Sequence, residues 1–66
     1  MEYLIYGKRN GIDKTFRALD KDGVRVSKKS EAMSYATKED ALEILNTPDI
    51  QKNIEEGKVE FDVRRG

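Results

Sequence analysis

Alternation of apolar and polar positions marks strands near both ends of the chain. Residues 3–8 are rich in aromatic and β-branched side chains, a composition typical of a strand. In residues 58–64, Val59, Phe61 and Val63 alternate with charged residues. This second pattern predicts a strand with one buried face and one face in water.

Two glycine-containing dipeptides predict the turns that follow the first strand. Asn-Gly at 10–11 and Asp-Gly at 22–23 are the residues that type I′ hairpin turns favour, because both central positions of that turn need a positive φ. They predict a second strand over about residues 15–20 and a third over about 24–28. A short extended piece over residues 33–36 is expected before the first helix.

The two predicted turns fix which residues face each other. A turn closing at Asn10-Gly11 places Tyr3 opposite Ala18 and Ile5 opposite Phe16, and the next turn places Leu19 opposite Val26. Apolar side chains then occupy both faces of the sheet, and helices can cover only one of them. Either a bulge shifts a register, or an apolar patch stays exposed as a candidate protein-binding face. The residues of that candidate face are Tyr3, Ile5 and Phe16.

The middle of the chain predicts two helices. Thr37 is placed to cap the first helix, whose apolar stripe spans residues 41–45. Thr47 before Pro48 starts a short second helix, and Gly57 ends it. The prediction is therefore one α+β domain over residues 1–66. The elements follow one another along the chain in the order β-β-β-α-α-β. The strands form a small antiparallel sheet, and the main helix and the short second helix pack on one face of it.

The amino-acid composition limits the catalytic and metal-binding chemistry that the chain can support. The 66 residues contain no cysteine and no histidine, so thiolate and imidazole metal sites and histidine-activated nucleophiles are excluded. We expect no catalytic residues, no metal and no cofactor. The longest apolar run, residues 3–6, is far shorter than a membrane span, and the first residues do not resemble a signal peptide. A cytoplasmic location without membrane contact is expected.

Charge is balanced overall but unevenly distributed. The chain has 13 basic and 13 acidic residues, and residues 1–36 hold eight of the basic ones against five acidic. Several of these basic residues lie on or beside the predicted hairpins, where they form a candidate nucleic-acid surface. They are Lys14, Arg17, Arg25, Lys28 and Lys29.

Residues 3–45 resemble a known family of DNA-binding domains. The similarity lies in Asp-Gly-Val-Arg-Val at 22–26 and Tyr-Ala-Thr-Lys-Glu-Asp-Ala at 35–41. Three short strands followed by this helix start resemble the Arm-type (AP2-like) domain of phage-type tyrosine integrases. The resemblance implies a three-stranded sheet that lies in the DNA major groove and contacts DNA through outward basic residues. The opening segment, residues 3–8, also resembles the start of other short bacterial and phage reading frames.

Two function classes remain open. In the first, a small non-enzymatic accessory or regulatory protein binds an unidentified protein partner or a second copy of itself. In the second, the basic face of the hairpin sheet binds DNA. Non-specific affinity for nucleic acid comes mostly from neutralising phosphates, so the zero net charge favours protein binding.

Overall fold

The first strand is the centre of an antiparallel sheet of four strands. The protein is described from a computed structural model that covers residues 2–66. The elements in chain order are β1 (Tyr3–Arg9), β2 (Arg17–Ala18), the 3-10 helix η1 (Lys29–Glu31), β3 (Ser34–Tyr35), α1 (Lys38–Leu45), α2 (Pro48–Glu55) and β4 (Val59–Arg65). Strand β4 pairs with β1 along its whole length, so the short strands β2 and β3 share the other edge of β1.

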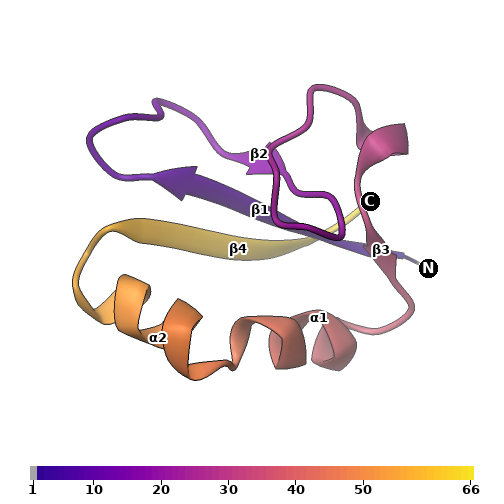
Figure 1. The fold of residues 1–66 in the computed structure, drawn as a ribbon. Helices are drawn as coiled ribbons and strands as arrows, with labels where there is room; N and C mark the ends of the chain where they lie inside the picture. Colours follow the sequence, from indigo (N-terminus) through magenta and orange to yellow (C-terminus); the bar gives the residue numbers. More distant parts are fainter. Residues whose placement is uncertain (1) are drawn as a thin grey trace.

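Both α-helices lie in one layer on the same side of the sheet (Figure 1). The predicted α+β class and the helix layer are confirmed. The predicted final strand is present as β4, and the extended piece before the first helix is present as β3. We call the side that faces α1 and α2 the helix face of the sheet, and the opposite side its outer face.

The helix ends follow the predicted signals, with one difference. The Thr37 hydroxyl accepts a 3.1 Å hydrogen bond from the Asp40 amide, as expected of an N-cap. Thr47 occupies the N-cap of α2, but its side chain makes no capping bond and Pro48 starts the helix. Gly57 has a φ of 73°, and the amide of Lys58 donates to the Asn53 carbonyl, which closes α2 as a Schellman motif.

The predicted register of the first hairpin is wrong. Ala18 lies opposite Tyr6, three residues along β1 from the predicted partner Tyr3. Gly11 has a φ of 81°, but Asn10 does not have a positive φ, so the two-residue type I′ turn does not form. The chain makes a wider loop instead. A shift by an odd number of residues moves every side chain of β2 to the other face.

The predicted third strand does not form as expected. Leu19 makes an isolated bridge with Arg25, one residue from the predicted partner Val26. The Asp20 carboxylate accepts hydrogen bonds from the amides of Asp22 and Val24, which fixes the turn around Gly23 without extending a ladder. After this turn the chain passes through η1 and reaches the sheet as β3.

The core lies between the helix face and the helices. Its buried members Ile5, Leu19, Ala41 and Leu45 are contacted by partly buried Tyr35, Ile50, Phe61 and Val63. The Phe61 ring packs directly on the backbone of β1. A Cβ atom added at Gly7 would lie 3.0 Å from Phe61 Cδ1 and 3.2 Å from Leu19 Cδ1. Glycine at this position therefore lets the ring pack on the strand.

Candidate binding surfaces

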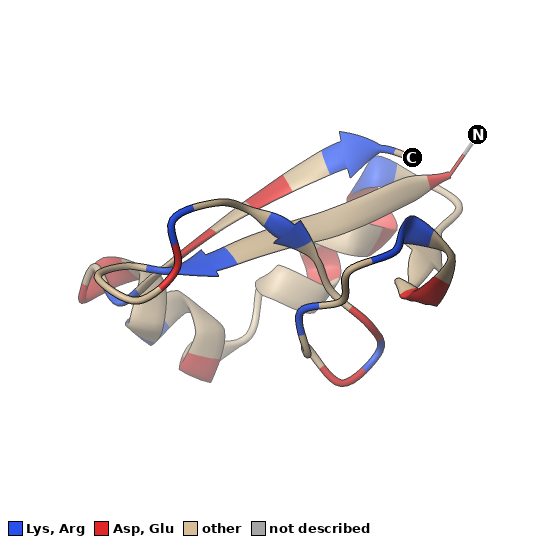
Figure 2. Cartoon of the chain, turned by 90° about the horizontal axis from the view of Figure 1, so that it is seen from above, with Lys and Arg blue, Asp and Glu red and all other residues tan. Residues whose placement is uncertain are grey.

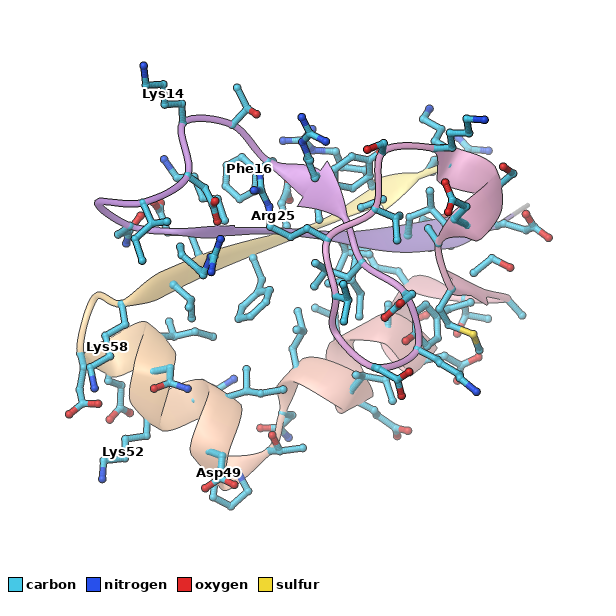
Figure 3. The ribbon with its side chains drawn as sticks, turned by 45° about the horizontal axis from the view of Figure 1, so that its top comes forward. Lys14, Phe16, Arg25, Asp49, Lys52 and Lys58 are labelled. Atoms are coloured by element: carbon cyan, nitrogen blue, oxygen red, sulfur yellow. The ribbon has the colours of Figure 1, made fainter. Side chains whose placement is uncertain are left out.

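The three residues predicted to form a protein-binding face do not share a surface. Tyr3 and Ile5 lie on the helix face, because residues of β1 separated by two point to the same side. Ile5 is only 3% exposed and belongs to the core. Phe16 lies on the outer face (Figure 3). The shifted register separates them, so the predicted face of Tyr3, Ile5 and Phe16 is wrong as a single surface.

A different set of side chains meets on the outer face. The Arg64 guanidinium carbon lies 4.6 Å from the centre of the Tyr6 ring and 5.2 Å from that of Phe16. The Lys8 ammonium lies 5.5 Å from the centre of the Phe16 ring. These distances are within the range of cation–π contacts. We call Tyr6, Lys8, Phe16 and Arg64 the outer-face cluster.

Carboxylates hold both cations of the outer-face cluster. Lys8 Nζ lies 3.4 Å from Glu60 Oε2, and Arg64 Nε donates to Asp62 Oδ2 at 2.8 Å. Glu60 and Asp62 belong to β4, whose alternate residues point to the outer face. The surface is therefore aromatic and ionic together, and its cations are already oriented. Once the pairing of β1 with β4 is known, the alternation of residues along the two strands is enough to place Tyr6, Lys8 and Arg64 on the same face.

The segment after the Gly23 turn covers the other end of the outer face. Leu4 lies on this face and is only 4% exposed. A hollow beside it is lined by Lys29, Ser30 and Ala32 of the η1 region, together with residues of β3 and of both chain ends. Figure 1 shows this region close to the N-terminal end of β1. The covering segment leaves the aromatic rings of the outer-face cluster partly exposed.

Arg25, one of the predicted nucleic-acid contacts, has a structural role instead. Its Nη1 lies 2.7 Å from Asp13 Oδ1, and its Nη2 donates to the carbonyl of Thr15. The same carboxylate accepts bonds from the side chain and the amide of Arg9 at 2.8 to 3.1 Å. Arg25 thus joins the loop after β1 to the next loop, and its guanidinium is not available to a phosphate.

This set of bonds changes the acidity of Asp13. The hydrogen bonds from Arg9, helped by the charge of Arg25, lower the pKa of the Asp13 carboxyl to about 2. The hydrogen bond to Asp13, helped by the negative charge of that carboxylate, in turn raises the pKa of Arg9. Asp13 is therefore ionised throughout the neutral range. Its role is to fix the wide loop that replaces the predicted type I′ turn.

The other four predicted nucleic-acid contacts remain exposed. Within residues 2–66, none of Lys14, Arg17, Lys28 and Lys29 forms an ion pair, and Arg17 only donates to the Ser27 hydroxyl at 3.2 Å. Figure 2 looks onto the outer face and shows basic segments on β2 and at the ends of β1 and β4, with acidic segments of β4 between them. The surface is mixed in charge.

The described residues hold no group of three or more side chains able to bind a metal ion. None of the helices in residues 2–66 is long and apolar enough to cross a membrane.

No protein-family model, curated protein or solved structure matches the chain. The resemblance to integrase DNA-binding domains therefore rests on the quoted residues alone.

Proposed function

We propose that this domain is a non-enzymatic binding protein that contacts a protein partner through the outer-face cluster. One observation carries the proposal. Both helices pack on one face of the sheet, and the other face presents Tyr6 and Phe16 with Lys8 and Arg64 against their rings.

The residue types of the outer-face cluster suit protein recognition. Tyrosine and arginine dominate the residues that carry binding energy in interfaces, because they bury large areas and keep a polar group at the end. Arg64 and Lys8 are already held in place, so binding would cost less side-chain entropy than ordering free side chains. The cluster fits a partner that inserts an apolar side chain between the rings and brings a carboxylate to the cations.

The test compares two apolar-to-serine variants in a capture experiment. Phe16→Ser removes the ring that both cations contact, whereas Ile12→Ser changes a loop residue that is 69% exposed. Immobilised wild type and Ile12→Ser should retain the same protein from a lysate, and Phe16→Ser should lose it. Thermal melts followed by circular dichroism confirm that both variants fold. Equal retention by folded Phe16→Ser would refute the proposed surface.

DNA binding is the second candidate, and the four exposed basic side chains favour it. If Lys28 and Lys29 each neutralise a phosphate, changing both to glutamine should reduce the slope of log affinity for duplex DNA against log salt concentration by about two units. Changing Lys52 and Lys58, which lie on the helix side in Figure 3, is the matched control. A fluorescence titration against random-sequence duplex at about 50 mM salt measures this. We expect no binding at tens of micromolar protein, and a salt-sensitive signal lost only in the Lys28 and Lys29 variant would reverse the ranking.

A further inference from the structure

The outer edge of β4 has no partner within the described chain. β4 pairs only with β1, and no backbone hydrogen bond joins its other edge to residues 2–66. In Figure 2 no part of the ribbon lies beyond this edge. An unpaired edge strand of seven residues is a template for another strand.

The pairing with β1 determines which backbone groups this edge offers. The Gly66 amide donates to the carbonyl of Glu2, and the Asn10 amide donates to the carbonyl of Lys58. Hydrogen-bonded positions alternate along an antiparallel pair, so the even-numbered residues of β4 bond to β1. The odd-numbered residues Val59, Phe61, Val63 and Arg65 direct their N–H and C=O groups outward.

We propose that this edge pairs with the same edge of a second copy, in an antiparallel register centred on Val63. Val63 then lies opposite Val63 of the second copy, and Phe61 lies opposite Arg65, all with outward backbone groups. On the outer face Asp62 lies opposite Arg64 of the second copy, and the two-fold axis repeats this pair. These are non-hydrogen-bonded positions, where opposite side chains approach most closely.

Charge selects this register over its neighbours. Centring the pairing on Asp62 or on Arg64 would place that residue opposite its own copy, with like charges in contact. Centring it on Phe61 would place Glu60 opposite Asp62. The intrachain pair of Asp62 and Arg64 is about half exposed, so both groups are accessible to a second copy. Among the registers centred on residues 61–64, only the one centred on Val63 places opposite charges at every pair that β4 forms on the outer face.

The proposed interface is small, so we expect a weak dimer that forms in the micromolar to millimolar range of concentration. Two charge variants test it by sedimentation velocity and native mass spectrometry. Asp62→Lys places a lysine opposite Arg64 in a homodimer, and Arg64→Glu places a glutamate opposite Asp62. Each variant alone should dimerise about 10-fold or more weakly than wild type.

Mixing the two variants separates the proposed pairing from the intrachain ion pair. In the mixed dimer both cross-strand pairs become complementary, although neither chain regains its own Asp62–Arg64 bridge. The equimolar mixture should recover dimer made of one copy of each variant. A control mixture carries Arg65→Pro in both chains, which removes an outward N–H without touching the bonds to β1. This control should stay monomeric. If it dimerises as strongly as the mixture without Arg65→Pro, the two variants attract each other through charge without pairing their β4 edges, and the proposed pairing is refuted. A wild type that stays monomeric to about 1 mM, or a mixture that does not recover dimer, would also overturn the proposal.

Discussion

Gly7→Ala should destabilise the fold mainly because the added methyl group would press on the Phe61 ring. The added methyl carbon would lie 3.0 and 3.1 Å from two carbons of that ring and 3.2 Å from Leu19 Cδ1. Such distances force the side chains to move in a core that has few other members. Overpacking of this kind costs about 1–3 kcal/mol. The loss of chain entropy in the unfolded state offsets about 0.4–1 kcal/mol of this. A net loss of about 1–2 kcal/mol is a large part of the ~3–5 kcal/mol that a core of this size supplies.

A double-mutant cycle identifies the cause of the loss. Phe61→Leu removes the ring edge, so adding alanine at Gly7 in that background should cost less than about 0.5 kcal/mol. Urea denaturation followed by far-ultraviolet circular dichroism gives the four free energies of unfolding. If Gly7→Ala costs the same with phenylalanine and with leucine at position 61, the ring contact is not what requires glycine there.

Two further predictions concern the loop after β1 and the helix caps. The pKa of Asp13 is lowered to about 2, so its contribution to stability is complete above about pH 4 and is lost as the pH falls toward 2. The gap in urea midpoint between wild type and Asp13→Asn should therefore be widest at neutral pH and narrow between about pH 4 and 2.5; a constant gap would contradict the role given to this carboxylate. Thr37→Ala should lower the free energy of unfolding by about 1 kcal/mol, because its hydroxyl caps α1, and Thr47→Ala by only a few tenths. Equal losses in the two threonine variants would show that the Thr37 bond contributes little.

The parts of the fold that the sequence predicts well depend on contacts close along the chain. A threonine three residues before the amide it caps, proline at the start of α2 and glycine after its end are local signals, and each element begins or ends where they indicate. The strict alternation of β4 is also local, since it needs only a period of two residues.

The hairpin registers could not be predicted because side-chain bonds in the loops, some of them between distant residues, determine them. The loop after β1 is closed by bonds between Arg9 and Asp13, and Arg25 reaches back 12 residues to the same carboxylate. Its width shifts the pairing of β2 by three residues and moves Phe16 to the face opposite Ile5. Of the three predicted protein-binding residues, only Phe16 therefore contributes to the outer-face cluster. The sequence alone predicts Arg25 as a nucleic-acid contact, because it does not show that Asp13, which lies in another loop, pairs with the Arg25 guanidinium.

The two proposed functions use the same side of the sheet, which makes their experiments directly comparable. Lys28 and Lys29 belong to the segment around η1 that lies next to buried Leu4, and Phe16 lies in the exposed cluster on that face. Each variant should therefore be measured against both ligands. Loss of the captured protein in Phe16→Ser, with the lysine variant unchanged, supports recognition by aromatic rings. Loss of duplex binding in the lysine variant, with the Phe16 variant unchanged, supports recognition by charge. Pairing of two β4 edges would engage Arg64 of the outer-face cluster but would leave the Tyr6 and Phe16 rings and the η1 segment on an open face. It would bring two copies of that face into one continuous sheet, so a dimer would strengthen binding to a repeated partner in both cases.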